Sequence, residues 1–226
     1  MTGRLSSLPL APDVEEMPEA ARDVFGARLP TATAYVDLLA TAGVERGLIG
    51  PRERPRLWTR HVLNSAAVAG ALADAPSLRV VDVGSGAGLP GIPLSLVRPD
   101  LRITLLEPLA RRVSFLDEAV ATLALDIEVL RGRAEEVGEP RWDVAIARAV
   151  APLERLLALA ERLLLPHGVL LAIKGRTADA EVSAAAAAIG RRSTREAEIL
   201  TVGDGVVGAT VVRVTLDRHG SRRRGS

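Results

Sequence analysis

The feature that most constrains this chain is a glycine-rich segment that directly follows a short run of apolar, mostly β-branched residues. Leu78–Val83 has the composition of a buried strand, and glycine then recurs at every second position, at Gly84, Gly86 and Gly88. Glycine lets the backbone turn sharply and leaves no side chain between the backbone and a bound ligand. Pro90 and Pro93 suit the first turn of a following helix, where a missing N–H costs little. The segment therefore predicts a strand, a ligand-facing loop and a helix in succession.

Strand-like and helix-like segments alternate after this point. Short β-branched runs are found at Arg102–Leu106, Ile127–Arg131, Trp142–Ala147 and Val169–Ile173. Helical periodicity lies between them, which predicts a parallel sheet covered by helices on both faces. Two further runs, joined by a glycine-rich turn, predict a terminal antiparallel hairpin: Arg195–Val202 and Ala209–Leu216. We expect a Rossmann-like α/β fold with a seven-stranded, mostly parallel sheet.

The other segments set the expected domain organisation. Residues 1–12 lack periodicity and predict a disordered arm. Helical patterns at Val14–Gly43 and Leu57–Ala73 predict an N-terminal helical extension over residues 13–76. The α/β domain is expected over residues 77–217, with Pro166 ending one of its helices, and a basic flexible tail over residues 218–226.

Composition excludes several kinds of site. The 226 residues include no cysteine, so disulfides and a cysteine nucleophile are excluded, and three scattered histidines are poor material for a metal site. No apolar run approaches the roughly 18 residues that a membrane span needs. The N-terminus also lacks the basic start and long apolar stretch of a secretory signal. We expect a cytoplasmic protein that uses no metal, has no membrane partner and acts as a monomer.

The glycine loop fits two classes of ligand. Gly86, Gly88 and Gly91 match the dinucleotide pattern G-x-G-x-x-G, which would indicate a nicotinamide-dependent oxidoreductase. An alignment that begins at Gly84 places the first glycine directly after the strand. Asp82 favours this second alignment, because many S-adenosylmethionine-dependent methyltransferases carry an acid there. A tight turn without any ligand is the third alternative, and the class I methyltransferase fold is the expected one.

Two acidic positions further along the chain agree with a nucleoside ligand. Glu107 ends the second strand, close to the position about 20 residues after the glycine loop where an acid binds ribose hydroxyls. It also fits the wider methyltransferase pattern. The third strand ends in Arg131–Glu136, where a backbone N–H and a carboxylate could read an adenine edge. An ordinary charged loop fits that segment equally well.

The string from Asp82 to Pro93, Asp-Val-Gly-Ser-Gly-Ala-Gly-Leu-Pro-Gly-Ile-Pro, resembles the small-subunit ribosomal RNA guanine-N7 methyltransferase family RsmG, formerly called glucose-inhibited division protein B. The chain departs from that family at Asn64, where many relatives have Asp, and at Glu107–Pro108, where Asp-Ser is common. Four further stretches resemble the family in the same order: Leu57–Ser65, Arg112–Leu116, Arg148–Leu153 and Lys174–Gly175.

The resemblance implies S-adenosylmethionine as the cofactor. It implies N7 of one guanine in the decoding-region loop of 16S ribosomal RNA, or of the small ribosomal subunit, as the target. It places Gly84 and Leu89 against the methionine and ribose side of the cofactor. It places Ala134 and Glu135 at the adenine, and Arg148 at the reactive end of the cofactor, as a cofactor-binding residue as well as a catalytic one.

The chemistry of this reaction asks for alignment more than for acid–base groups. Guanine N7 attacks with a free lone pair and needs no deprotonation. Alignment of the reacting atoms is worth up to roughly 7–11 kcal/mol. Guanine presents O6 and N7 as paired acceptors to a fork of N–H donors. Arg148 is therefore the first candidate for a catalytic cationic group, and a surface arginine at the end of a strand is the alternative.

Basic residues near the same edge are candidates for RNA contact. Lys174 is the single lysine among 29 basic residues, so a phosphate contact would explain it, and chance survival is the alternative. Arg60 and His61 belong to a basic cluster that could follow an RNA backbone or form a solvated loop, together with Arg52, Arg54 and Arg56. A methyltransferase of a small molecule would share every cofactor residue, and a non-catalytic ribosome-assembly factor could keep the fold.

Overall fold

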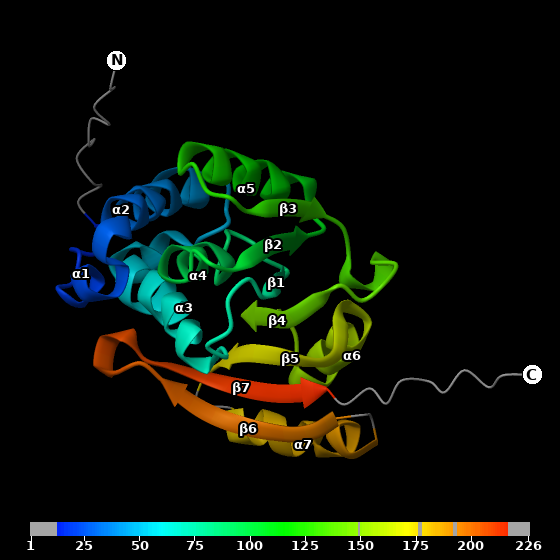
Figure 1. The fold of residues 1–226 in the computed structure, drawn as a ribbon. Helices are drawn as coiled ribbons and strands as arrows, with labels where there is room; N and C mark the ends of the chain where they lie inside the picture. The colour runs from blue at the N-terminus through cyan, green and yellow to red at the C-terminus, as the bar shows by residue number, and fades with distance from the viewer. Residues whose placement is uncertain (1–12, 149, 176–177, 192–193, 217–226) are drawn as a thin grey trace, which may run out of the picture.

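The computed structural model describes residues 13–148, 150–175, 178–191 and 194–216 (Figure 1). Seven strands form one sheet in the order β3-β2-β1-β4-β5-β7-β6. Their bounds are β1 Arg79–Val83, β2 Arg102–Glu107, β3 Glu128–Arg131, β4 Trp142–Arg148, β5 Leu164–Lys174, β6 Thr194–Val202 and β7 Ala209–Leu216. The expected disordered arm, residues 1–12, and the expected basic tail, residues 218–226, lie outside the described residues.

The strand directions confirm the predicted sheet. β1 to β5 pair in parallel, and β7 runs antiparallel to both β5 and β6, so β7 is the reversed strand of the terminal hairpin. The registers pair Asp82 with Leu105 and Ile146, and Glu107 with Arg131. The carboxyl ends of β1 to β4 therefore meet at one edge of the sheet, where ligands bind in open α/β folds.

Helices cover both faces of the sheet (Figure 1). The N-terminal helices, α4 and α5 share one hydrophobic core with one face, and α6 and α7 form a second core with the other face. None of the described helices is long and apolar enough to cross a membrane. The helical bounds are α1 Ala20–Phe25, η1 Gly26–Arg28, α2 Leu29–Leu38, η2 Leu39–Gly43, η3 Pro51–Arg56, η4 Leu57–Leu63, α3 Asn64–Ala66, η5 Ala67–Ala71, α4 Gly91–Val97, α5 Ala110–Thr122, η6 Ala134–Glu136, α6 Leu153–Leu163, α7 Ala178–Arg191 and η7 Gly205–Val207.

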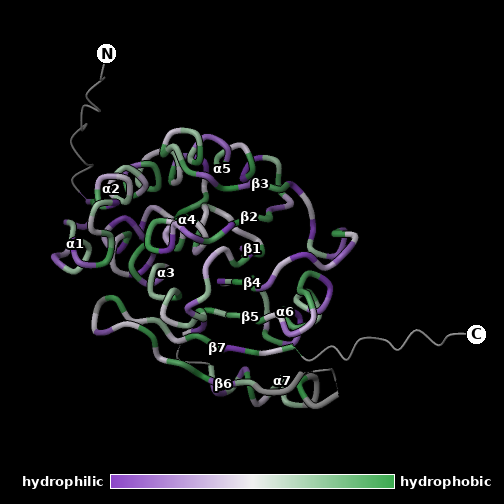
Figure 2. Tube along the Cα trace, in the orientation of Figure 1, coloured by the Kyte–Doolittle hydropathy of each residue, from purple (hydrophilic) through white to green (hydrophobic). Residues whose placement is uncertain are grey.

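Strand alternation explains why β1 serves both cores. Val80 faces the core of the N-terminal helices, and Val81 and Val83 face the core of α6. Figure 2 shows that the central strands are mostly hydrophobic along their length. Tyr35 and Trp58 are fully buried in the first core. The N-terminal helices are therefore packed against the sheet and help to shape its carboxyl edge.

The first helical pattern contains a break that the sequence interpretation did not place. Val14–Gly43 was expected to be helical throughout, but α1 ends at Phe25 and Gly26 adopts a φ of +46°. That backbone conformation cannot continue a right-handed helix. The chain then passes through η1 into α2, where Pro30 occupies the first turn.

The expected role of Pro166 was also wrong. α6 ends at Leu163, and Pro166 lies within the first part of β5. The pairing of β5 with β4 is irregular at this point, because the register shifts between Trp142 and Val144. His167 has a φ of +66°. A proline cannot donate to the ladder, and such irregularities are where strands tolerate it.

Candidate active site

The glycine loop turns tightly over the carboxyl ends of β1 and β2. The φ values of Gly84, Gly86 and Gly88 are +68°, +59° and +93°, a region that residues with a Cβ rarely adopt. The N–H groups of Gly84 and Ser85 both donate to the Leu106 carbonyl, at 2.8 and 3.2 Å. Backbone geometry alone therefore accounts for glycine at these three positions.

The space beside these glycines differs between positions. A Cβ at Gly88 would lie 2.4 Å from the Ile92 Cδ1, so packing within the chain closes that position. A Cβ at Gly84 would meet the Val150 side chain at 3.1 Å, and at Gly86 the nearest atom would be the Gly84 carbonyl at 3.9 Å. Gly86 is thus the open position of the loop, whereas Gly84 lies against the Val150 side chain.

Asp82 is a fully buried carboxyl group at the end of β1. Its Oδ2 accepts a hydrogen bond from the Gly91 N–H at 2.9 Å, and its Oδ1 has no hydrogen-bond partner among the described residues. Burial raises the pKa of Asp82 to about 7, although the Gly91 N–H and the Arg148 charge oppose the rise. A buried acceptor without a partner costs free energy, so positive charge near this edge would stabilise the ionised form of Asp82.

Glu107 is the second buried acid at this edge, and its side chain is 1% exposed. Its Oε2 accepts from the Gly86 N–H and its Oε1 from the Leu109 N–H, each at 3.0 Å. Arg112 lies 3.6 Å from Oε2. A carboxylate oxygen can accept more than one hydrogen bond. Glu107 can therefore hold the glycine loop and still receive a ribose hydroxyl.

A small cavity of about 160 Å³ lies beyond Glu107, between the glycine loop and η6. Ala134 forms a buried part of its wall. The exposed Glu135 is held by α6, because Arg155 contacts its carboxylate at 3.5 Å and Arg162 donates to its carbonyl at 3.0 Å. The remaining lining includes Gly84, Leu106, Pro108, Gly132, Arg133, Val150, Ala151 and Leu159.

A larger cavity of about 770 Å³ lies on the other side of the loop that follows β4. It shares Val150 and Ala151 with the small cavity, so the two hollows adjoin across that loop. Its lining is rich in polar and basic groups, including Arg60, His61, Asn64, Arg148 and Lys174. In the described part of the chain, His, Asp and Glu side chains form no group of three suited to a metal ion.

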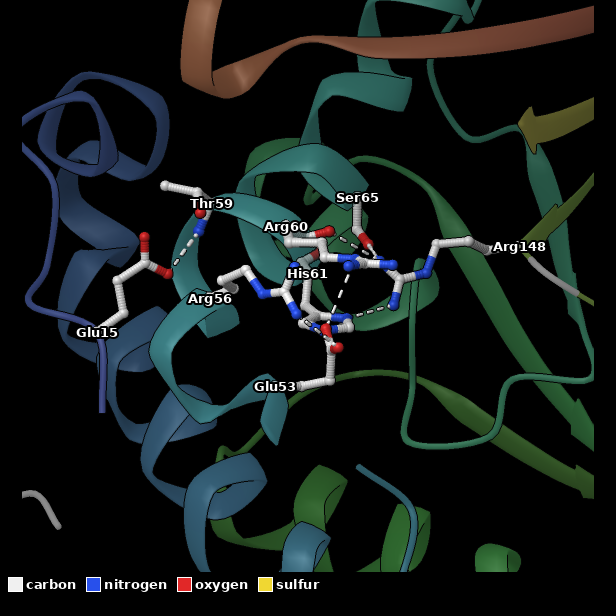
Figure 3. A network of polar contacts seen from close by, with 8 residues as sticks. All are labelled: Glu15, Glu53, Arg56, Thr59, Arg60, His61, Ser65 and Arg148. Atoms are coloured by element: carbon white, nitrogen blue, oxygen red, sulfur yellow. Dashed lines mark hydrogen bonds and ion pairs between the residues drawn. The ribbon is translucent and has the colours of Figure 1, made fainter. Parts of the chain in front are cut away.

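Arg148 ends β4 and projects into a network of acceptors on η4 and α3 (Figure 3). Its Nη2 lies 2.7 Å from Nδ1 of His61. Its Nη1 donates to the carbonyls of Arg60 and His61 at 3.3 and 3.4 Å, and to the Ser65 hydroxyl at 3.4 Å. Nε2 of His61 lies 2.8 Å from Oε2 of Glu53. The guanidinium is thereby held from one side in a single orientation.

The network fixes the protonation of His61. A guanidinium only donates, so Nδ1 must accept from Arg148 and Nε2 must carry the proton that is donated to Glu53. Burial lowers the pKa of His61, and the Arg148 charge adds to the effect. Burial acts to raise the pKa of Glu53, but the His61 hydrogen bond and the charge of Arg60 outweigh it and lower the pKa. A neutral imidazole therefore lies between a cation and an anion.

Two polar side chains at this edge hold neighbouring elements together. Lys174 donates to the Ala151 carbonyl at 3.0 Å and forms an ion pair with Glu181 of α7 at 2.6 Å. Asn64 donates from Nδ2 to the Gly208 carbonyl at 2.9 Å. A carboxylate could not donate this bond, so the asparagine at position 64 suits the local packing.

Comparisons with known proteins agree with this geometry. Residues 28–206 match the family described as GidB, rRNA small subunit methyltransferase G. The chain belongs to the GidB family. It is 56% identical to the ribosomal RNA small subunit methyltransferase G of Streptomyces coelicolor over 211 residues, covering 91% of this chain and 87% of the relative. It is 55% identical to that of Streptomyces avermitilis, with 91% and 88% covered.

A solved structure supports the fold of this GidB-family chain. A putative class I S-adenosylmethionine-dependent methyltransferase from Listeria monocytogenes superposes with a TM-score of 0.61, at 10% identity, over 88% of this chain and 71% of that one. The predicted family and the predicted Rossmann-like methyltransferase fold are both confirmed. Family membership also removes the oxidoreductase alternative that Gly86, Gly88 and Gly91 had left open.

The structure brings most of the predicted site residues to one edge, while their roles stay predictions. Gly84, Ala134 and Glu135 line the small cavity, and Arg148 and Lys174 line the large one. Lys174, Arg60 and His61 were the predicted RNA-contacting residues; Arg60 is exposed, whereas His61 is buried and bonded at both ring nitrogens. His61 is therefore better placed to hold Arg148 than to meet RNA directly.

Four residues of the site were not singled out from the sequence. Glu53 is the single acid in the basic run Pro51–Arg56, where the arginines on both sides dominate the charge pattern. Ser65 and Val150 carry no spacing signal, since their partners lie 83 and 66 positions away. Tyr35 donates to the Ala87 carbonyl at 2.8 Å and supports the glycine loop from α2. A lone acid inside a basic segment is the one usable signal of the four.

Proposed function

We propose that this protein transfers a methyl group from S-adenosylmethionine to N7 of one guanine in the decoding-region loop of 16S ribosomal RNA. The observation that carries the proposal is the pair of adjoining cavities at the carboxyl edge of the sheet. One is lined by Gly84 and η6, and the other by Arg148. A cofactor in the first and a nucleotide in the second would meet at the loop after β4.

The residues around the small cavity suit S-adenosylmethionine. The cofactor supplies an activated methyl group on a cationic sulfur. Glu107 offers carboxylate acceptors for ribose hydroxyls, and Ala134 with Glu135 bounds the space for the adenine. Asp82, with its unpartnered Oδ1, favours positive charge nearby. Leu89 is buried next to Gly88 at the end of the glycine loop, and we expect it to support the loop on the methionine and ribose side of the cofactor.

The residues around the large cavity suit a guanine nucleotide. Its volume lies in the range of ligand pockets. Arg148 offers N–H groups to guanine acceptors at a fixed position, and Arg60 offers positive charge for the RNA backbone. N7 uses its own lone pair, so the chain has no proton to remove. Its contribution is to hold the base in line with the methyl group and to exclude water.

The test uses small ribosomal subunits that lack the modification, together with labelled S-adenosylmethionine. N7-specific strand scission then maps any methyl group. We expect one methylated guanine in the decoding-region loop.

Gly84→Ala places a Cβ at a φ of +68° and 3.1 Å from Val150, so cofactor binding should weaken. Arg148→Ala should leave cofactor binding and abolish most transfer. Arg102→Ala, at the opposite edge of the sheet, is the control and should retain activity.

Cofactor binding without transfer to ribosomal RNA would contradict the proposed substrate and favour a small-molecule acceptor. No cofactor binding at all would favour an assembly factor that has kept the fold. The remaining parts of the proposal are action in the cytoplasm, on the small subunit or its RNA, as a monomer and without a metal ion.

A further inference from the structure

Three side chains from three segments are joined by a continuous series of hydrogen bonds (Figure 3), and two of them, His61 and Arg148, line the large cavity. Glu53 lies on η3, His61 on η4 and Arg148 at the end of β4. The two contacts that join them are 2.8 and 2.7 Å long. His61 and Arg148 lie 87 positions apart and meet because the N-terminal helices pack on the carboxyl edge of the sheet.

The hydrogen bonds in this series all run in one direction, from Arg148 towards Glu53. The Arg148 guanidinium donates to Nδ1 of His61, and His61 donates from Nε2 to Glu53, so the carboxylate selects the tautomer that can accept from the arginine. The side chain of His61 is 11% exposed and that of Glu53 25% exposed. His61 is therefore covered from water, while Glu53 takes part in the exposed ion pairs with Arg56 and Arg60.

We propose that Glu53 is a positioning residue for methyl transfer, acting through His61 to hold the Arg148 guanidinium at the acceptor base. This inference rests on the proposed function and deepens it. Protonation of His61 would place a proton on Nδ1 directly opposite the Arg148 donor. The arginine would then lose its closest acceptor, and the two positive charges would repel each other. The groups that face His61 are Glu53 on η3, Arg60 on η4 and Arg148 on β4, with Arg56 paired to Glu53.

The first measurement is the pH profile of single-turnover transfer to unmodified small subunits. The wild-type rate should fall on the acid side, at a pH below the ordinary histidine value of about 6.5. Glu53→Gln can still accept from Nε2 but carries no charge, so the acid limb should move to lower pH. Its plateau rate should fall between about 10- and 100-fold because the guanidinium is less well fixed. The KM for the subunits should change much less than kcat.

A conservative replacement tests whether Glu53 acts through the histidine. His61→Asn places an amide oxygen near the position of Nδ1, so it can still accept from Arg148 but cannot titrate or reach Glu53. We expect it to keep part of the rate and to lose the acid limb. In the His61→Asn background, Glu53→Gln should cause no further loss. A full additional loss would overturn the proposal. Glu118→Gln, which removes the acid of the distant Arg46–Glu118 ion pair, should behave as wild type.

A second readout does not depend on activity. The chain has three histidines, so nitrogen NMR can follow the His61 ring directly. We expect the Nε2–H tautomer in the wild type and a lower His61 pKa in Glu53→Gln. The Nδ1–H tautomer, or an unchanged pKa, would overturn the proposal. If the wild type transfers no methyl group to ribosomal RNA, the proposed function fails, and the NMR result still shows whether Glu53 sets the state of His61.

Discussion

Two buried acids at neighbouring strand ends differ in how many of their carboxylate oxygens accept a hydrogen bond. Glu107 accepts from two backbone N–H groups, one for each carboxylate oxygen. Asp82 accepts from one backbone N–H, and its Oδ1 lacks a hydrogen-bond partner among the described residues. Desolvation therefore dominates at Asp82 and raises its pKa to about 7. Family membership does not explain why one acid is satisfied and the other is not.

The raised pKa of Asp82 predicts an unusual pH dependence of stability. The folded state binds this proton more tightly than the unfolded state, so the stability it contributes is present below about pH 4 and is lost as the pH rises through about 7. Asp82→Asn does not titrate. Its stability relative to wild type should rise between pH 4 and 8, by up to about 4 kcal/mol. Denaturant unfolding of the cofactor-free protein measures the difference.

A matched control has the opposite sign. Arg79 lies 3.0 Å from Asp143 and lowers its pKa through a hydrogen bond, outweighing partial burial. Asp143→Asn should therefore cost stability at neutral pH, and the cost should disappear as the pH falls below the ordinary aspartate range. Parallel stability curves for Asp82→Asn and wild type from pH 4 to 8 would show that Asp82 is not the source of the pH dependence.

At the scale of elements, the sequence predicted what depends on local pattern. The strand alternation and the glycine spacing predicted the sheet and its edge, because side-chain period and turn geometry are local properties. The break at Gly26 was missed, since helical periodicity continues on both sides of it. The antiparallel strand of the hairpin could not be chosen, because β6 and β7 have similar patterns. The link from Glu53 to Arg148 depends on packing between segments 87 residues apart at their closest contact.

Lys174 joins two elements, which offers a second explanation for the single lysine. Its Nζ contacts Glu181 of α7 at 2.6 Å, and its side chain is 7% exposed. Lys174→Met should lower the free energy of unfolding by about 2 kcal/mol, less than for a fully buried pair because Glu181 is partly exposed. In the Lys174→Met background, Glu181→Gln should lower the free energy of unfolding by less than it does in the wild type. A double-mutant cycle measures that coupling.

The same variant tests the predicted phosphate contact. If the ion pair with Glu181 explains why position 174 is a lysine, the salt dependence of binding to the small subunit should have the same slope in Lys174→Met as in the wild type. A slope reduced by about 0.7–0.9 would instead indicate one lost phosphate contact. Thermal unfolding of each variant, followed before the binding measurement, separates loss of structure from loss of contact.

At the scale of the whole molecule, the two edges of the sheet carry different chemistry. The carboxyl edge holds both cavities of the proposed site. The amino edge has its own hollow of about 610 Å³, which is lined by both basic and acidic side chains, including Arg79, Arg102, Asp126, Glu128 and Arg141. The net charge of the chain is only +1. Attraction to RNA must therefore come from where the charge lies and not from its total.

This asymmetry predicts that equal charge changes at the two edges have unequal effects. Arg60→Gln removes an exposed charge beside the large cavity, and Arg102→Gln removes one at the amino edge. Binding to unmodified small subunits should weaken in Arg60→Gln, and its slope against salt should fall by about 0.7–0.9. Arg102→Gln should keep the wild-type affinity and slope. Equal effects would mean that RNA is attracted by diffuse charge, and a loss confined to Arg102→Gln would move the RNA contact to the opposite edge.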